Sequence, residues 1–485
     1  MLQKRERLKT YTTLSSIQHE LLQGKITCQH LAEDYLQRIE KNKHLNAYLE
    51  VFATETIAKA KLIDQKIANK EKLGRLFGCM LGIKDVICYK NHKVGAASKI
   101  LENFESLYTA TALERLLAED AIILGRLNCD EFAMGGSNEN SAYGAVRNAY
   151  DNSKVAGGSS GGSSVAVQAN LCLAALGSDT GGSVRQPAAF CDVIGLKPTY
   201  GRISRHGLIA YASSFDQIGT LTQSTKDAAI LLEIMAGKDR FDSTSSNEKV
   251  AAFSEMKPFE QKAKIAYFKE ALNADGLDEE IKQETQRLLN QLKAAGHEVV
   301  AVDFPYLKYI VATYYVLTTA EASSNLSRYD GIHFGYRNKE AKNMDMTYKK
   351  SRSEGFGKEV KKRIMLGAFV LSAGSYNAYY AKAQKVRRLI YEETCNIFQD
   401  FDFIVMPTTP TTAPEIGAKD KQDAVSVYLA DIFTVHPNLA GMPAMSLPLF
   451  QHSNSMPYGF QIVANKFEEA KMLSFADYLM RNFGK

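Results

Sequence analysis

The first 70 residues repeat apolar positions with the period of an α-helix. "TLSSIQHELLQG" has apolar residues three to four positions apart, between a threonine that can cap a helix and a glycine that can end it. "TCQHLAEDYLQRIEKN" repeats the pattern. The apolar positions of the two stretches are Leu14, Ile17, Leu21 and Leu22, then Leu31, Tyr35, Leu36 and Ile39. We therefore expect residues 1–70 to form an N-terminal helical segment that packs on the remainder of the chain.

From about residue 75, short apolar runs alternate with helical patterns. Predicted strands cover 79–87, 121–127, 171–179, 264–268, 297–304, 403–406 and 460–463, and predicted helices cover 110–120 and 278–295. Strands that alternate with helices are typical of an α/β fold. Residues 341–363 are polar and predict a solvated helical face. We expect residues 71–485 to form one catalytic domain, with a single domain overall.

Composition narrows the possible functions. Hydrophobic residues make up 45% of the chain and charged residues 23%, as in soluble globular proteins. The net charge of +5 is small for 485 residues and gives no argument for nucleic-acid binding. The seven cysteines form no CxxC pair and the nine histidines form no HExxH motif, so no metal site is predicted. The N-terminus lacks an apolar core and no apolar run reaches about 18 residues, which favours a cytoplasmic protein that does not bind membranes.

The densest glycine-serine stretch, "GGSSGGSS" at 157–164, allows several interpretations. A flexible linker is disfavoured because apolar residues that must be buried follow at once. A phosphate-binding loop would need a lysine after Gly162, and none follows. A nucleophile elbow centred on Ser159 matches GxSxG, but polar residues precede it where an apolar strand is required.

A second glycine-rich loop, "GSDTGGSVRQPA" at 177–188, follows an apolar run and precedes a helix start near Val184. Backbone N–H groups at a helix N-terminus lack helical partners and carry partial positive charge. The N–H groups of Thr180, Gly181, Gly182 and Ser183 could therefore stabilise an oxyanion. Ser183 could be the nucleophile beside them, and it could equally be a helix cap.

A serine nucleophile needs a base. Among the histidines, only His206 and later ones follow Ser183, and none lies in a recognisable motif. Lys84 ends the apolar run "LGIKDVI", and burial disfavours a charged lysine. Holding it neutral at pH 7 would cost roughly 4.6 kcal/mol relative to its ordinary pKa of ~10.4. The alternative is a lysine at a strand end that reaches water.

Together and in this order, "GIKD", "GGSSGGS" and "DTGGSVRQP" resemble the amidase signature family over nearly the whole chain. The resemblance implies an α/β fold with a mixed central sheet, covered by helices on both faces. It implies a Ser-cisSer-Lys triad in which Lys84 is the general base, Ser159 relays the proton after a cis peptide bond, and Ser183 is the acyl-ester nucleophile.

Within that family, segments such as "EFAMGGSNENSAYG" and "SRSEGFGKEVKKRIMLG" are similar to the glutamine-hydrolysing subunits of tRNA-dependent amidotransferases. The similarity implies that glutamine is held by Tyr314, Arg363 and Asp431, with Tyr315 as the alternative to Tyr314. It also implies a heterotrimer with B and C subunits, in which the B subunit uses ATP and Mg²⁺ and receives misacylated tRNA. This chain would then need no cofactor and no metal of its own.

Two other functions stay open. A stand-alone amidase would use the same triad on another amide and would need no partners. A non-catalytic scaffold subunit would carry the same residues as a relic. The predicted substrate residues could also have purely structural roles, because Arg363 ends a basic helical run and Asp431 could cap a helix.

Overall fold

The computed structural model describes residues 10–418 and 430–484, and in them one mixed sheet runs through the molecule. The strands are β1 Tyr48–Val51, β2 Met80–Lys84, β3 Ile122–Leu127, β4 Ala174–Asp179, β5 Ile194–Lys197, β6 Gln217–Thr222, β7 Lys264–Phe268, β8 Glu298–Val302, β9 Phe403–Pro407, β10 Ala444–Gln451 and β11 Pro457–Ala464. Their order across the sheet is β1-β3-β2-β4-β6-β5-β10-β11-β9-β7-β8. The predicted α/β class and mixed sheet are confirmed.

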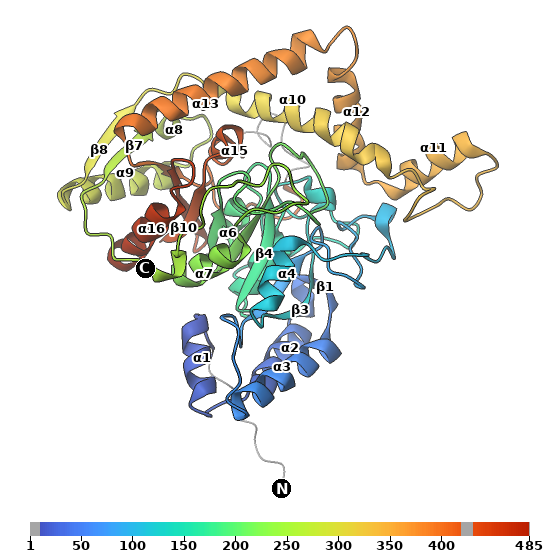
Figure 1. Ribbon diagram of the computed structural model, residues 1–485. Helices are drawn as coiled ribbons and strands as arrows, with labels where there is room; N and C mark the ends of the chain where they lie inside the picture. Colours follow the sequence, from blue (N-terminus) through green and yellow to red (C-terminus); the bar gives the residue numbers. More distant parts are fainter. Residues whose placement is uncertain (1–9, 419–429, 485) are drawn as a thin grey trace.

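Helices flank the sheet (Figure 1). They are α1 Leu14–Leu22, α2 Cys28–Lys41, α3 Ala53–Ala68, α4 Thr111–Ala118, α5 Gly161–Gln168, α6 Arg185–Phe190, α7 Thr225–Met235, α8 Lys269–Leu272, α9 Glu279–Ala294, α10 Leu307–Asn325, α11 Met344–Gly355, α12 Lys358–Val370, α13 Lys382–Asp400, α15 Val435–Ala440 and α16 Glu469–Phe483. A π-helix, η6, covers Asn377–Ala381. None of the helices in the described ranges is long and apolar enough to cross a lipid bilayer.

The N-terminal helices α1–α3 form a lobe below the sheet in Figure 1. Thr13 caps α1 by accepting from the N–H of Ser16, and Thr27 caps α2 in the same way. The expectation that this region is helical needs one correction, because β1 lies within it and pairs antiparallel with β3 at the sheet edge. The proposed boundary at residue 70 stays a prediction.

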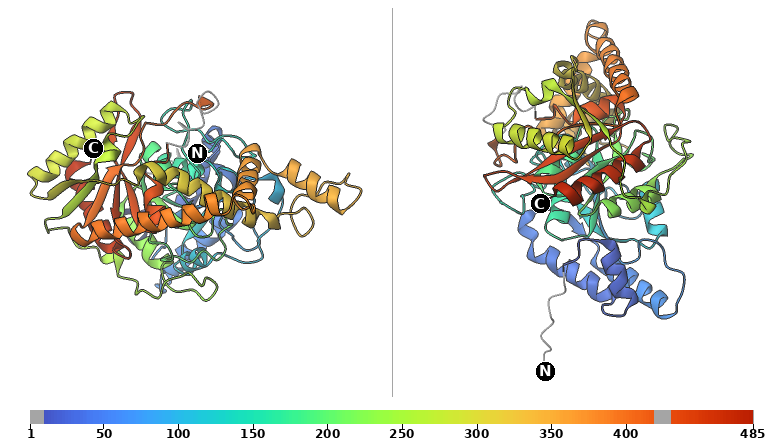
Figure 2. Two further views of the ribbon diagram at one scale, coloured as in Figure 1. Left: turned by 90° about the horizontal axis from the view of Figure 1, so that it is seen from above. Right: turned by 90° about the vertical axis from the view of Figure 1, so that its left-hand side faces the viewer.

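The strand that ends in Lys84 and the strand that precedes the loop of Ser183 are neighbours in the sheet. β2 and β4 are buried along their whole length, as expected for parallel strands covered on both faces. They pair in parallel with Ile83 opposite Leu176, so their carboxyl ends, with Lys84 and Ser178, meet at one edge. Within the polar stretch 341–363, α11 projects away from the body in Figure 1 and in the left view of Figure 2, whereas the start of α12 packs against α10 with Val360 and Arg363 buried.

Candidate active site

Lys84 is the last residue of β2 and is fully buried. Its Nζ lies 2.7 Å from Ser159 Oγ, 2.9 Å from Ser160 Oγ and 2.9 Å from Ser178 Oγ. A neutral amine has two N–H donors and one lone pair. Donation to Ser160 and Ser178 would leave that lone pair to accept the Ser159 proton, which is the arrangement a general base needs.

Burial lowers the pKa of Lys84 to about 8, while the Cys129 thiol and nearby carboxyl groups, Asp130 among them, oppose the shift. A substantial neutral fraction therefore exists just above neutral pH. The structure thus places Lys84 inside the protein; the alternative of a lysine that reaches water is not what it shows.

Ser159 lies in the loop that leads into α5, and the Gly158–Ser159 peptide bond is cis. Side chains and backbone around this loop fix its path. Gly158 donates its N–H to Gln186 Oε1 at 2.9 Å, and Gln186 Nε2 in turn donates to Gly136 O at 2.7 Å. The N–H of Ser160 donates to Ser183 O at 3.1 Å, which ties the glycine-serine stretch to the second loop.

Asp179 organises the second loop. Its carboxylate accepts from the N–H groups of Gly182 at 2.9 Å and Val184 at 3.2 Å, and it pairs with buried Arg185 at 3.0 Å. Arg185 and neighbouring donors lower the pKa of Asp179 to about 2, against the opposing effect of burial. Because the Gly182 N–H already donates to Asp179, an oxyanion that it stabilises would share this donor with the Asp179 carboxylate. The oxyanion hole at Thr180, Gly181, Gly182 and Ser183 stays a prediction.

Two glycines let other elements approach this loop. A Cβ on Gly181 would lie 2.5 Å from the Tyr314 ring, and one on Gly182 would lie 2.3 Å from Thr434 Oγ1. Gly182 also has φ +123°, a conformation that disfavours other residues. The sequence "TGG" is therefore what permits α10 and the segment before α15 to close against the loop.

A small cavity brings the predicted nucleophile Ser183 together with the predicted substrate residues. Its lining residues are Ala133, Gly135, Gly158, Gly181, Gly182, Ser183, Tyr314, Tyr315, Arg363 and Asp431. Ser183 keeps 8% of its surface exposed, whereas Ser159 and Lys84 are closed off entirely. These exposed fractions fit the predicted roles, in which the base Lys84 and the relay Ser159 are buried and the nucleophile Ser183 can be reached by a substrate.

Arg363 is buried on the inner face of α12. Its Nε donates to Glu359 Oε1 at 2.8 Å, and its Nη1 donates to the Tyr211 hydroxyl at 2.8 Å. The guanidinium also lies over the rings of Tyr211 and Tyr315, at 5.5 and 5.4 Å from their centroids. These contacts orient a fixed positive charge at the cavity, which suits a carboxylate.

Asp431 accepts a hydrogen bond from the Tyr315 hydroxyl at 3.1 Å. Burial raises its pKa to about 6, while this bond and Arg363 oppose the rise. Asp431 is thus an anion at neutral pH and can accept from an ammonium group. Both tyrosines line the cavity, but Tyr314 lies against Gly181, so the contact with Asp431 belongs to Tyr315.

Sequence reasoning missed several residues that support the site. Ser160 and Ser178 contact Lys84 but belong to different elements, and no spacing connects them. Asp216, which accepts from Thr180 Oγ1 at 2.7 Å, was likewise not predicted. His206, the histidine that could have served as base, stacks between Tyr108 and Phe241 at another place in the fold.

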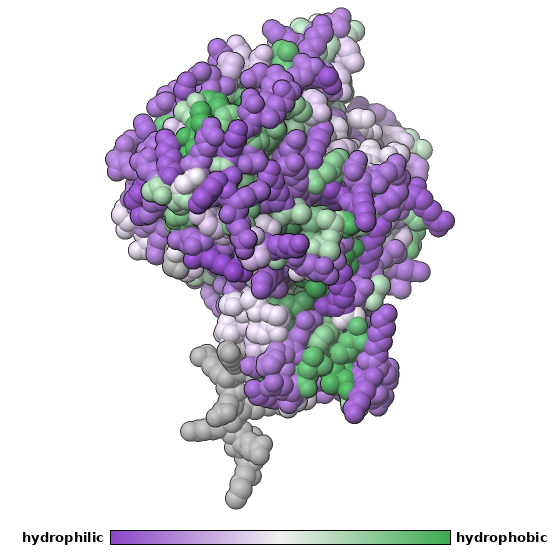
Figure 3. Space-filling model, turned by 60° about the vertical axis from the view of Figure 1, so that its left-hand side comes forward, coloured by the Kyte–Doolittle hydropathy of each residue, from purple (hydrophilic) through white to green (hydrophobic). Residues whose placement is uncertain are grey.

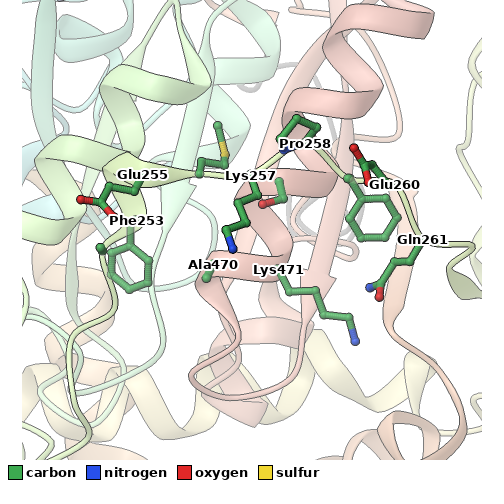
Figure 4. A pocket seen from close by; sticks show the side chains of 12 residues that line it. Phe253, Glu255, Lys257, Pro258, Glu260, Gln261, Ala470 and Lys471 are labelled. Atoms are coloured by element: carbon green, nitrogen blue, oxygen red, sulfur yellow. The ribbon is translucent and has the colours of Figure 1, made fainter.

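Figure 4 shows a larger hollow of about 530 Å³ formed by residues 252–261 and α16. Its lining includes none of the predicted site residues. Within the described part of the chain, no three His, Cys, Asp or Glu side chains form a group that could hold a metal ion.

Comparisons with known proteins identify the family of the chain. The Amidase family model matches residues 30–473. The A subunit of the glutamyl-tRNA(Gln) amidotransferase of Chlorobium limicola is 49% identical, over 98% of this chain and 99% of that protein. The crystal structure of the protein of the same name from Thermotoga maritima superposes with a TM-score of 0.77 and 39% identity, covering 94% of this chain and 92% of that chain.

A structure of a peptide amidase from Stenotrophomonas maltophilia is also similar, with a TM-score of 0.80 and 26% identity over 98% of this chain and 97% of that chain. The likeness thus extends from amidotransferase subunits to other amidases. The family match spans most of the sequence and includes every residue of the cavity. The chain belongs to the amidase family.

Proposed function

We propose that this chain is the glutamine-hydrolysing subunit of a tRNA-dependent amidotransferase, which releases ammonia to convert Glu-tRNA(Gln), Asp-tRNA(Asn) or both to the amide form. One observation carries the proposal: a single cavity joins Ser183 to Arg363 and Asp431, and Lys84 is hydrogen-bonded to Ser159 behind it. The near full-length similarity to proteins named as the A subunit of such an amidotransferase supports the choice of substrate.

Free glutamine has the groups that the cavity can recognise. Its α-carboxylate would pair with Arg363, and its α-ammonium would pair with Asp431, which Tyr315 holds in place. The side-chain amide would then extend to Ser183. An amide without a free amino acid backbone would form neither of these ion pairs with Arg363 and Asp431, so it should bind more weakly than glutamine.

In the proposed acylation, neutral Lys84 takes the proton of Ser159 as Ser159 takes that of Ser183. The Ser183 oxygen attacks the glutamine amide carbon, and backbone N–H groups of residues 180–183 stabilise the oxyanion. The C–N bond breaks as the relay returns a proton to the nitrogen, and ammonia leaves. Water, deprotonated by the same relay, attacks the Ser183 ester, releases glutamate and restores the Ser183 hydroxyl.

The partners follow from the same proposal. A B subunit would bind ATP, Mg²⁺ and the misacylated tRNA, a C subunit would complete a heterotrimer, and this chain would need no cofactor. Glutamine hydrolysis by the reconstituted complex tests the proposal, with and without misacylated tRNA and ATP. Stimulation by both substrates supports it, whereas hydrolysis unaffected by partners points to a stand-alone amidase.

The stand-alone amidase is the second candidate, favoured by the structural likeness to a peptide amidase. Higher activity on a peptide amide than on glutamine would support it over the main proposal. An inert scaffold is the third possibility, and an acyl-enzyme trapped on Ser183 would exclude it.

A further inference from the structure

Asp216 is a buried acidic residue that the proposed reaction does not use. Acidic side chains usually lie at the surface of a protein, and the face shown in Figure 3 is mostly hydrophilic. Asp216, in contrast, keeps only 3% of its surface exposed. Burial raises its pKa to about 7, Glu321 adds to the rise, and hydrogen bonds from uncharged donors oppose it. A carboxyl group in such a place is costly, so its hydrogen bonds indicate what it contributes.

Three donors from two segments of the chain point at the Asp216 carboxyl group. Thr180 Oγ1, in the loop before α6, donates to Oδ1 at 2.7 Å. The N–H groups of Tyr211 and Ala212 donate to Oδ2 at 2.9 Å and to Oδ1 at 3.1 Å. The carboxyl group therefore connects the loop before α6 to the segment before β6.

The contact with Thr180 fixes the loop between β4 and α6, which carries Ser183 and is called the nucleophile loop below. In the antiparallel pair of β4 with β6, Asp179 lies opposite Gln217. Thr180 follows Asp179, and Asp216 precedes Gln217, so the two side chains meet at the end of the pair. Thr180 lies three positions before Ser183, and its N–H is one of the predicted oxyanion donors.

The contact with Tyr211 reaches the predicted substrate residues. Tyr211, whose N–H is bound by Asp216, accepts a hydrogen bond on its hydroxyl from Arg363 Nη1 at 2.8 Å. The same hydroxyl donates to Thr318 Oγ1 at 3.0 Å, and Thr318 donates to Tyr314 O at 2.8 Å within α10. One carboxyl group thus lies between the nucleophile loop and the residue that orients Arg363.

Resting on the proposed function, we propose that Asp216 is a positioning residue for glutamine hydrolysis. Through Thr180 it fixes the nucleophile loop, and through Tyr211 it fixes Arg363, the predicted partner of the α-carboxylate. The nucleophile and the bound substrate then keep the separation that their reaction requires. In the structural alternative, Asp216 only closes the turn of residues 211–216 through the two backbone N–H groups. The two roles differ in what the Thr180 hydroxyl contributes.

Thr180→Val separates the two roles, because it removes this hydroxyl and keeps both backbone hydrogen bonds to Asp216. In the reconstituted complex, kcat for glutamine hydrolysis should fall at least about tenfold, since the nucleophile loop loses a hydrogen bond to a charged group. KM should stay within about twofold of wild type, because Arg363 keeps its contacts. Thr180→Ser retains a hydroxyl and should restore kcat to within about threefold of wild type.

Thr111→Val is the matched control. Thr111 Oγ1 donates to Asp239 Oδ2 at 2.6 Å, both residues are buried, and neither lines the cavity. The variant loses the same kind of hydrogen bond, so its Tm should fall by an amount similar to that of Thr180→Val, while kcat stays within about twofold of wild type. An equal loss of kcat in both variants would mean that destabilisation alone explains the effect, and the proposal would be wrong.

Asp216→Ala removes all three hydrogen bonds, so it should lower kcat at least about tenfold and raise KM at least about fivefold. Adding Thr180→Val to it should lower kcat by less than about twofold further, because the hydroxyl acts through a carboxyl group that is already absent. Tyr211→Phe, which keeps Thr180 bound to Asp216, should raise KM about fivefold and change kcat by less than about threefold. Losses of kcat that multiply in the double variant would contradict the proposal. Thr180→Val and its serine rescue test the proposal even where Asp216→Ala fails to fold.

The same measurements separate this proposal from the proposed function. Glutamine hydrolysis by the wild-type complex, with Ser183→Ala as the blank, tests the glutaminase. If that activity is present and Thr180→Val leaves kcat unchanged, the positioning role alone is overturned. If the wild type hydrolyses a peptide amide but not glutamine, and Thr180→Val lowers that rate at least about tenfold, the glutaminase is overturned and the role of Asp216 at the nucleophile loop is supported.

Discussion

The wall of the cavity that carries Ser183 is built from strands and loops between residues 80 and 185, whereas the other wall comes from three segments between 314 and 431. In the first, called the catalytic wall, Lys84 makes hydrogen bonds with Ser178 on β4 and with Ser159 and Ser160 in the loop before α5. In the second, the substrate wall, Arg363 and Asp431 are held mainly by aromatic side chains.

This difference separates two kinds of contribution. Buried polar networks that are fully hydrogen-bonded hold reacting groups in a fixed geometry, so changes in the catalytic wall should act on kcat. Charges that pair with the non-reacting end of a substrate contribute to binding in ground and transition states alike, so changes in the substrate wall should act on KM. The following variants test this comparison.

Ser183→Ala should have the largest effect. We expect kcat for glutamine hydrolysis to fall by about 10⁶-fold, the loss that removing a catalytic serine causes in other serine hydrolases. Glutamine should still bind, because Arg363 and Asp431 are unchanged, and calorimetry of the variant with glutamine should give a Kd close to wild type. A residual rate above one hundredth of wild type would show that Ser183 is not the nucleophile.

Lys84→Met should come next, with kcat lower by about 10³- to 10⁴-fold, within the range for loss of a general base. In the wild type, kcat/KM should rise with pH through about 8, because only the neutral amine can accept the Ser159 proton. The variant should lose this rise. A wild-type profile that stays flat between pH 7 and 9 would contradict the assignment of Lys84 as base.

Arg363→Gln should affect the substrate wall. Loss of a charged pair with the α-carboxylate should raise KM by about 30- to 100-fold, corresponding to about 2–3 kcal/mol, while kcat changes by less than about threefold. The control is Arg388→Gln, since Arg388 is an exposed arginine paired with Glu392 on α13. An equal loss of kcat in Arg363→Gln would remove the distinction between the two walls.

The catalytic wall was predictable because its residues lie in short, contiguous motifs. "GIKD" placed Lys84 at the end of a buried strand, and "DTGGS" placed Ser183 at a helix start, and the structure shows both. The network around Lys84 was not predictable, because Ser178 reaches the amine only through the parallel pairing of β2 with β4, and Ser160 reaches it only from the loop that leads into α5. Local patterns carry no information about such pairings.

Elsewhere, tertiary packing overrides local preference. Residues 161–168 begin with glycines and serines, which are poor helix formers, yet they form α5 because almost the whole segment is buried. The four residues of β1 are too short a run to stand out among helical patterns, and pairing with β3 makes them a strand. In the substrate wall, Tyr314 and Tyr315 are adjacent residues of the same type, so the sequence pattern cannot distinguish them. Only the packing of α10 decides which one contacts Asp431.

Tyr315→Phe should give the smallest of the four effects and tests that last point. Loss of one hydrogen bond to Asp431 should raise KM for glutamine by about five- to tenfold, or about 1–1.4 kcal/mol. The bond stabilises the charged carboxylate, so without it the pKa of Asp431 should rise from about 6. Because the anion is the form that binds ammonium, the acid limb of kcat/KM should move to higher pH. Tyr314→Phe is the matched control, with KM within about twofold of wild type and an unmoved acid limb. The opposite pattern, with the shift in Tyr314→Phe, would assign the contact to the other tyrosine.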